Sequence, residues 1–229
     1  MTSFSNIKAL IIDLDGTMLH TAPDFMVAIN RMREELQLAP LDEITITHFV
    51  GQGSENLITR VLSHDFEKDE VERHFAFAMQ RYQHHYLAIN GDYSELYPEV
   101  IEGLTQLKHS GYRLTCVTNK PMAFTEPLLS KKGLRQFFEV VYGGDSFPRK
   151  KPDPLPLTEA CRFFDLAPSQ VLAIGDSSND AKAARAAGCP VLVVPYGYNH
   201  GEAVQTIESD GIVASLFEVA QLLVKQRTI

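Results

Sequence analysis

Long apolar runs are missing from this chain of 229 residues. No stretch approaches the roughly 18 apolar residues that a membrane-spanning helix needs. The first apolar run, Ala9 to Ile12, is broken at once by Asp13, which makes it too short for the core of a signal peptide. We therefore expect no membrane partner and a cytoplasmic location.

Cysteine is also scarce. The three cysteines, Cys116, Cys161 and Cys189, are odd in number and widely spaced, and no C-x-x-C motif occurs. This pattern favours neither a disulfide framework nor a zinc site, and it fits a reducing compartment.

Basic residues are outnumbered, with 21 Lys and Arg against 29 Asp and Glu and a formal net charge of −8. Because a surface of this sign repels a phosphate backbone, we expect no nucleic-acid partner. A small anionic ligand would need a local positive site, since the overall charge of the protein does not attract it. The chain is long enough to bury a core without disulfides.

Short apolar runs, each followed by a loop, recur along the chain. They predict strands at residues 9–12, 114–117, 140–142, 171–174 and 191–194. Helical patterns separate these runs: Leu104 and Leu107 precede a glycine at 111, and residues 179–187 are rich in alanine. Strands that alternate with helices form parallel β-α-β units. We predict an α/β fold, with a Rossmann-like parallel sheet flanked by helices.

Residues 20–92 break this alternation. Ile29, Met32 and Leu36 give one periodic apolar face, and β-branched runs are few, so the whole region is predicted to be helical. We interpret it as an inserted α-helical cap. The catalytic core would then consist of residues 1–19 and 93–229, with hinges near 20–24 and 91–98.

The loops after the predicted strands carry acids, a hydroxyl, an amide and lysines. In chain order they are Asp13 and Asp15, Thr118 and Asn119, Lys150 and Lys151, and Asp176 and Asp180. In open α/β sheets ligands bind beyond the carboxyl ends of the strands. We therefore expect these side chains to meet in one crevice.

Four carboxylates in one crevice favour a bound cation. At about 4 Å, two carboxylates repel each other by roughly 4 kcal/mol at an effective dielectric of about 20. Such a cluster either takes up protons or binds a metal ion. Oxygen ligands with room for phosphate and water suit Mg²⁺, which we predict as the cofactor.

The same residues predict covalent phosphoryl transfer from a small phosphate monoester. Lys151, the Thr118 hydroxyl and backbone N–H groups that include that of Asn119 would hold the phosphate oxygens. Asp13 would attack phosphorus and form an aspartyl-phosphate. Asp15 would protonate the leaving alkoxide, and would then act as base on the water that cleaves the intermediate.

Each motif taken alone also has a purely structural explanation. A D-x-D-G segment is often an Asx turn, and Thr118 or Asn119 could be a helix N-cap. Lys151 could be a solvated lysine, Asp180 could simply complement a helix dipole, and Gly51-Gln52-Gly53 could be an inter-helix turn. The functional interpretation depends on the whole set occurring in order at successive strand ends.

Four segments resemble the motifs of the haloacid dehalogenase superfamily. They are Asp13-Leu14-Asp15-Gly16-Thr17, Val117-Thr118-Asn119-Lys120, Lys151-Pro152 and Gly175-Asp176-Ser177-Ser178-Asn179-Asp180. Asp15 is similar to the phosphatase branch, because the dehalogenases lack an acid there. The resemblance implies Mg²⁺ held by the Asp13 carboxylate, the Asp15 backbone carbonyl and Asp176. Asp180 would lie beside these ligands.

The cap segment Phe49-Val50-Gly51-Gln52-Gly53 resembles the cap loop of those bacterial phosphatases in this superfamily that act on 2-phosphoglycolate. The resemblance implies a phosphoric monoester hydrolase that releases glycolate and phosphate. It also implies that Gly51 and Gln52 face the organic end of the substrate, and that the cap opens and closes over the site. We expect a monomer or a homodimer.

Two alternatives remain open. A related phosphatase with the same core and another cap would act on a different small phosphate monoester, such as a sugar phosphate. A non-catalytic phosphate-binding regulator on the same fold would be expected to lack Asp13 or Asp15, and both are present. A mutase would have to protect its aspartyl-phosphate from water, and nothing in the cap sequence demands that.

Overall fold

A parallel sheet of six strands forms the centre of the protein, of which a computed structural model describes residues 4–227. In spatial order the strands are β5 (Val140–Tyr142), β4 (Arg113–Val117), β1 (Ala9–Ile12), β6 (Val171–Gly175), β7 (Val191–Val193) and β8 (Gly211–Ile212). The five predicted strands are confirmed to within one residue at each end. The two-residue edge strand β8 was not predicted, because it has no apolar run of its own.

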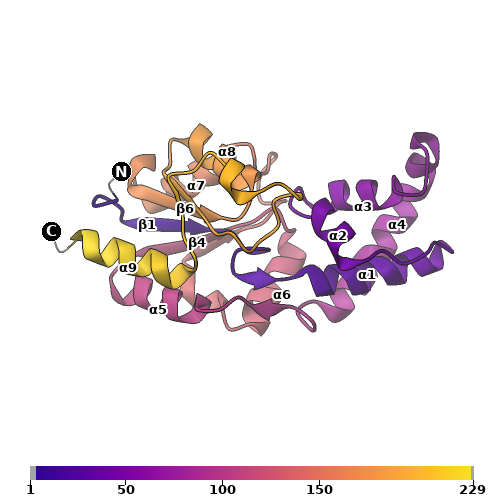
Figure 1. Ribbon diagram of the computed structural model, residues 1–229, viewed down its shortest axis with the longest axis horizontal. Helices are drawn as coiled ribbons and strands as arrows, with labels where there is room; N and C mark the ends of the chain where they lie inside the picture. The colour runs from indigo at the N-terminus through magenta and orange to yellow at the C-terminus, as the bar shows by residue number, and fades with distance from the viewer. Residues whose placement is uncertain (1–3, 228–229) are drawn as a thin grey trace.

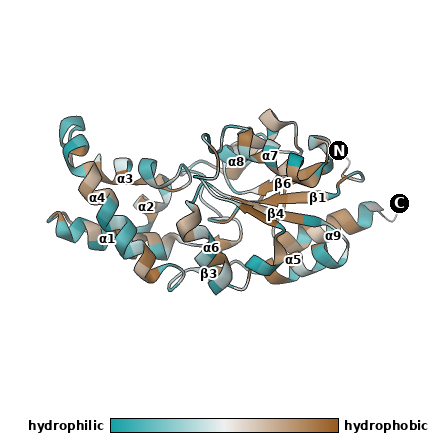
Figure 2. Cartoon of the chain, turned by 180° about the vertical axis from the view of Figure 1, so that it is seen from behind, coloured by the Kyte–Doolittle hydropathy of each residue, from teal (hydrophilic) through white to brown (hydrophobic). Residues whose placement is uncertain are grey.

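Helices cover both faces of this sheet (Figure 1). One face carries α5 (Val100–His109), α6 (Met122–Lys131) and α9 (Leu216–Arg227), and the other carries α7 (Leu155–Phe164) and α8 (Ser178–Ala187). In β1, Leu10 and Ile12 pack against the first face while Ala9 and Ile11 pack against the second. Burial on both faces explains why the strands are continuous apolar runs, coloured brown in Figure 2.

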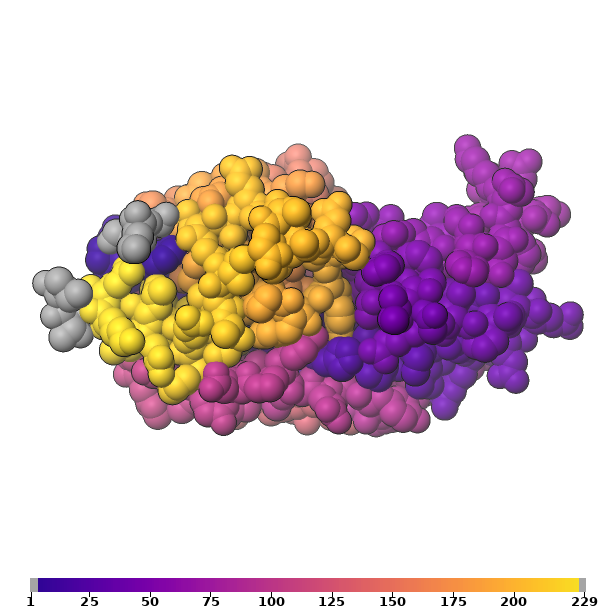
Figure 3. All heavy atoms as spheres, viewed as in Figure 1, coloured from indigo at the N-terminus to yellow at the C-terminus, as the bar shows by residue number. Residues whose placement is uncertain are grey.

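The remaining helices lie at one end of the molecule, opposite the chain termini (Figures 1 and 3). They are α1 (Ala22–Glu35), α2 (Glu43–Phe49), α3 (Ser54–Leu62) and α4 (Lys68–Ile89). Ile29 and Met32 of the predicted apolar face are fully buried in a cluster that these helices share. Phe124 and Tyr198 join this cluster from the sheet-bearing part of the chain. Whether residues 20–92 behave as a separate cap domain stays a prediction.

Three short 3-10 helices complete the described elements, at Arg135–Phe137, Pro168–Gln170 and Val204–Thr206. Across residues 4–227, every helix is either too short or too polar to span a lipid bilayer.

The two chain crossings between the sheet and the helical end are joined to each other. The strands β2 (Leu19–His20) and β3 (Glu95–Leu96) pair antiparallel at this junction. Asp24, buried in the first turn of α1, accepts hydrogen bonds of 2.8 Å from the backbone N–H groups of both Gly91 and Tyr93. Both crossings fall where the sequence predicts hinges. The buried Asp24 carboxylate holds the two crossings next to each other.

Candidate active site

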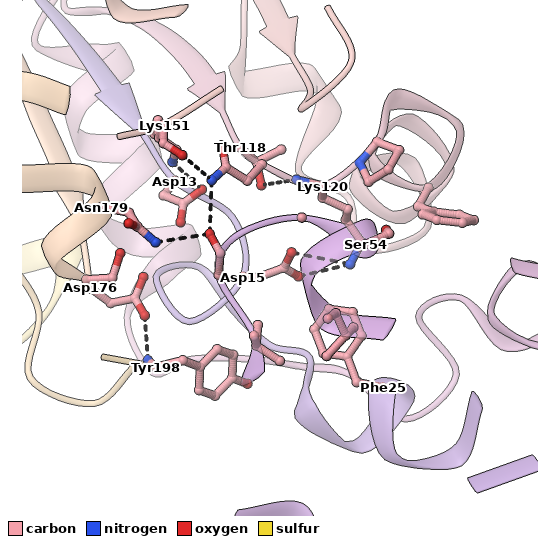
Figure 4. Close-up of a pocket in the computed structure, with 18 of the residues that line it drawn as sticks. Asp13, Asp15, Phe25, Ser54, Thr118, Lys120, Lys151, Asp176, Asn179 and Tyr198 are labelled. Atoms are coloured by element: carbon pink, nitrogen blue, oxygen red, sulfur yellow. Dashed lines mark hydrogen bonds and ion pairs between the residues drawn. The ribbon is translucent and has the colours of Figure 1, made fainter. Parts of the chain in front are cut away.

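A cavity of about 40 Å³ lies between the helical end and the carboxyl ends of β1, β4 and β6 (Figure 4). Most of the predicted site residues line it, namely Asp13, Asp15, Gly51, Thr118, Asn119, Lys151, Asp176 and Asp180. Gln52 is not among the lining residues, because the turn around it brings Gly51 and Gly53 to the cavity instead. Its predicted contact with substrate therefore has no support in this structure.

Lys151 is the centre of the charged cluster. Its Nζ lies 2.8 Å from Asp13 Oδ1 and 2.7 Å from Asp180 Oδ1, and it donates to the Val117 carbonyl at the end of β4 over 2.7 Å. The side chain is 5% exposed, so these three oxygens replace its water. Burial opposes the charge on Lys151, but Asp13 and Asp180 raise its pKa overall and keep it a cation. Lys150, by contrast, pairs with Glu55 at the surface.

Asp13 is poised between ionised and protonated forms. Burial raises its pKa to about 7, with Asp180 adding repulsion and the ammonium of Lys151 opposing the shift. Its Oδ1 accepts no hydrogen bond among the described residues, so the 2.8 Å contact with Lys151 is an ion pair outside hydrogen-bonding angles. The carboxylate is thus attracted by a cation without being tied down by several donors, as a nucleophile must be.

Asp176 is held by the two loops that pack around it. The Thr17 hydroxyl donates to its Oδ1 over 2.9 Å, and the backbone N–H of Tyr198 donates to its Oδ2. Gly16, with φ of +83°, allows this approach, because a Cβ there would lie 2.2 Å from Asp176 Oδ2. Burial, with repulsion from Asp180 and Asp13, raises the pKa of Asp176 well above its usual value.

Asp13, Asp176 and Asp180 each offer a carboxylate oxygen, and these three atoms lie within 4.8 Å of one another. Hard oxygen donors that repel one another suit a divalent cation, which offsets both the burial and the mutual repulsion that raise the pKa values of Asp13 and Asp176. Both carboxylate oxygens of Asp180 already have partners. Its Oδ1 accepts from Lys151, and its Oδ2 accepts from the Ser177 hydroxyl over 2.6 Å. A cation at this cluster would therefore be bound chiefly by Asp13 and Asp176, with Asp180 behind them.

Asn119 joins the two halves of the cavity. Its Nδ2 donates to the Lys151 carbonyl over 2.8 Å and to the Gly51 carbonyl, in the loop between α2 and α3, over 2.9 Å. Asn179 also donates to the Gly51 carbonyl, over 3.3 Å. Next to Asn119, the Thr118 hydroxyl accepts from the N–H of Lys120 over 3.2 Å, so its own proton remains for a ligand.

Sequence reasoning missed two residues of this site. Lys120, although it stands in the second motif, was given no role, yet its Nζ lies 3.1 Å from Asp15 Oδ1 and 2.6 Å from the Tyr86 hydroxyl. Tyr198, which binds Asp176 through its N–H, also accepts a 3.0 Å hydrogen bond from the N–H of Ala22 at the start of α1. The sequence signal for Lys120 is its place after Asn119. Tyr198 stands in the segment Tyr196-Gly197-Tyr198-Asn199, which also resembles the superfamily's phosphatases but by itself assigns the tyrosine no role.

The geometry agrees with a comparison against known families. The model of the haloacid dehalogenase-like hydrolases matches residues 10–194. This chain belongs to that family. The hydrolase is 47% identical to the phosphoglycolate phosphatase of Nitrosospira multiformis and 45% identical to that of Thiobacillus denitrificans. Each match runs over 219 residues and covers 96% of this chain and 96% of the relative.

A solved structure extends the similarity to the fold of the hydrolase. The crystal structure of a predicted phosphoglycolate phosphatase from Haemophilus somnus superposes with a TM-score of 0.89 at 32% identity, covering 95% of this chain and 98% of that one. The parallel sheet, the flanking helices and the helices at the carboxyl ends of the strands are thus shared with that structure.

Proposed function

We propose that this hydrolase converts 2-phosphoglycolate and water into glycolate and phosphate. The observation that carries the substrate is the similarity to two phosphoglycolate phosphatases over nearly their whole length. The cavity supplies the chemistry, because a buried carboxylate, a second acid and a buried lysine converge there. A non-catalytic phosphate-binding protein would need neither the nucleophile Asp13 nor the second acid Asp15 beside it.

In this proposal Asp13 is the nucleophile. Lys151, which already contacts its Oδ1, draws the phosphate into line and balances the charge of the ester. The Thr118 hydroxyl and the N–H groups beside it donate to the other phosphate oxygens. A bond forms between an Asp13 oxygen and phosphorus while the bond from phosphorus to the glycolate oxygen breaks.

Asp15 serves the leaving group and then the water. It donates its proton to the departing glycolate oxygen, and the resulting carboxylate accepts a proton from the water that attacks the aspartyl-phosphate. Asp15 lies in the cavity within reach of Lys120, and its side chain is 13% exposed. Burial of this kind keeps other water molecules away from the intermediate.

We assign Mg²⁺ as the metal of the proposed site, because all the available donors are oxygens. Asp13 and Asp176, with the backbone carbonyl of Asp15, would hold it. When bound, the ion neutralises charge on the phosphate that enters an acidic site. Asp180 keeps Lys151 in place beside these ligands.

The proposal also includes movement of residues 20–92 as a cap on the core of residues 1–19 and 93–229. The cavity lies between these two parts and is lined by residues of both, so a shift of the helical end would open it to substrate and enclose it again during turnover. A cytoplasmic location and a monomer or homodimer complete the proposal.

Phosphate release from a panel of esters tests the substrate. The panel contains 2-phosphoglycolate, 3-phosphoglycerate, several sugar phosphates and p-nitrophenyl phosphate, each with Mg²⁺ and with EDTA. We expect 2-phosphoglycolate to lead in kcat/KM by about a hundredfold, and EDTA to abolish turnover. Equal rates, or a sugar phosphate in the lead, would overturn the substrate while leaving the phosphatase chemistry in place.

A further inference from the structure

Lys120 is a buried cation whose surroundings come from both ends of the molecule. Its Nζ lies 3.1 Å and 3.3 Å from the two carboxylate oxygens of Asp15, and 2.6 Å from the hydroxyl of Tyr86 in α4. The ammonium also lies 4.4 Å from the ring centroid of Phe25 in α1. Keeping a charge in such an apolar setting is costly, so its retention calls for a purpose.

The two cations that line the cavity differ in how their N–H groups are paired. Among the described residues that line it, the only permanent cations are Lys151 and Lys120. Lys151 has three close oxygens from three different groups, and it serves the end where Asp13 lies. Lys120 also has three close oxygens, but two of them, at 3.1 Å and 3.3 Å, belong to the single carboxylate of Asp15. One N–H shared between those two oxygens leaves another N–H for a ligand.

Lys120 lies near the residue that is proposed to hold the phosphate, and both line the cavity. Lys120 follows Thr118, the residue proposed to hold phosphate, by two positions, which is at most about 7 Å of chain. Ser54, the first residue of α3, faces the same space beside Lys120 in Figure 4. The backbone N–H groups at the start of that helix favour an anion at this end.

We infer that Lys120 is a specificity-determining residue, whose ammonium binds the carboxylate of the substrate while the phosphate lies beside Asp13 and Lys151. The inference rests on the proposed function, because it names the group that recognises the organic end of 2-phosphoglycolate. Asp15 lies next to Lys120 and thus close to the ester oxygen that separates the two anions.

The cavity wall around Lys120 makes this recognition selective. Phe25, Leu57, Tyr82 and Phe124 also line the cavity and give it an apolar wall. In such an apolar setting, a carboxylate without a cation is strongly disfavoured, whereas one paired with Lys120 gains a charge-assisted hydrogen bond. An ester of the same length that carries a neutral hydroxyl gains much less, so the site discriminates by charge rather than by size.

Two matched substrates test the inference. 2-Phosphoglycolate and 2-hydroxyethyl phosphate both have a methylene next to the ester oxygen, but the second has a neutral hydroxymethyl group in place of the carboxylate. We expect Lys120→Met to reduce the preference for 2-phosphoglycolate, measured as the ratio of the two kcat/KM values, by about a hundredfold, chiefly through KM. Lys120→Arg, which keeps the charge, should retain most of the preference. Lys150→Met, which removes a surface lysine paired with Glu55, should leave the ratio unchanged.

The outcomes separate the inference from the proposed function. If the wild-type enzyme shows no preference for 2-phosphoglycolate, the proposed substrate is wrong. If the wild type shows the preference and Lys120→Met lowers both kcat/KM values equally, Lys120 only positions Asp15, and the carboxylate site is wrong. Lys120→Gln gives a second neutral variant, and circular dichroism and Tm show that each variant is folded.

Discussion

One lysine, Lys151, offsets part of the negative charge of the active-site acids. Lys151 forms an ion pair with Asp13 and donates hydrogen bonds to Asp180 and to the Val117 carbonyl. Within residues 4–227 Asp176 has no such cation, and its charge is stabilised by the Thr17 hydroxyl and the Tyr198 N–H. The site therefore keeps uncompensated negative charge beside its nucleophile, and this charge is what a metal ion would neutralise.

The raised pKa values lead to a prediction about pH and metal. Burial raises the pKa of Asp13 from 3.8 to about 7, so between these values the folded, metal-free enzyme holds a proton that the unfolded chain has released. Its free energy of unfolding therefore falls as the pH rises through this window. Mg²⁺ binds the ionised carboxylates, so it should raise Tm more at about pH 8 than at about pH 5.5. Thermal denaturation with Mg²⁺ and with EDTA measures this, and an equal or larger gain at the lower pH would contradict it.

The residues found from the sequence differ in kind from those that were missed. Asp13, Thr118 and Asp176 directly follow apolar strands, so their chemistry and place could be predicted together. Lys120 acquires its role only through Asp15, Tyr86 and Phe25, which lie in other parts of the chain. No local pattern encodes such contacts, and packing alone brings them together.

At the scale of elements, the loop after β7 connects the metal site to the helical end. The backbone of Tyr198 binds Asp176, while its hydroxyl accepts from the N–H of Ala22 and lies 2.8 Å from Nδ1 of His20. His20 belongs to β2, one of the two chain crossings. Tyr198 thus links the Asp176 carboxylate to the start of α1 at this junction.

Removing the Tyr198 hydroxyl tests this connection. Tyr198→Phe leaves the buried N–H of Ala22 without a partner, which costs about 1–3 kcal/mol. We expect Tm to fall by about 2–12 °C, at roughly 2–4 °C for each kcal/mol in a chain of this size. Differential scanning calorimetry measures the shift. The matched control is Tyr142→Phe, because the Tyr142 hydroxyl makes none of the described hydrogen bonds. Equal shifts in both variants would show that the Tyr198 hydroxyl contributes nothing particular.

Short elements were the ones that sequence patterns could not predict. The strands β2, β3 and β8 have two residues each, too few for a periodic signal. The pairing of β2 with β3 depends on residues that meet across the whole helical insertion. By contrast, the four-residue run of β1 and the periodic face of α1 were long enough to predict strand and helix correctly.

For the molecule as a whole, the positive charge in the cavity contrasts with the negative net charge of the chain. The chain carries a formal net charge of −8, yet two lysines are buried in the one cavity that holds the acidic cluster. A doubly anionic ester would meet Lys151 at one end and Lys120 at the other, with the acids and a metal ion between them. Closure of the helical end would then exclude water while the phosphate is transferred.

Trapping the covalent intermediate tests the central claim most directly. The enzyme would be mixed with Mg²⁺ and 2-phosphoglycolate labelled in its phosphate, quenched in acid during turnover and digested for peptide mapping. The account predicts label on the peptide that contains Asp13 in the wild type, and none in Asp13→Asn, which should be folded and inactive. Label on another residue, or wild-type turnover in Asp13→Asn, would contradict it.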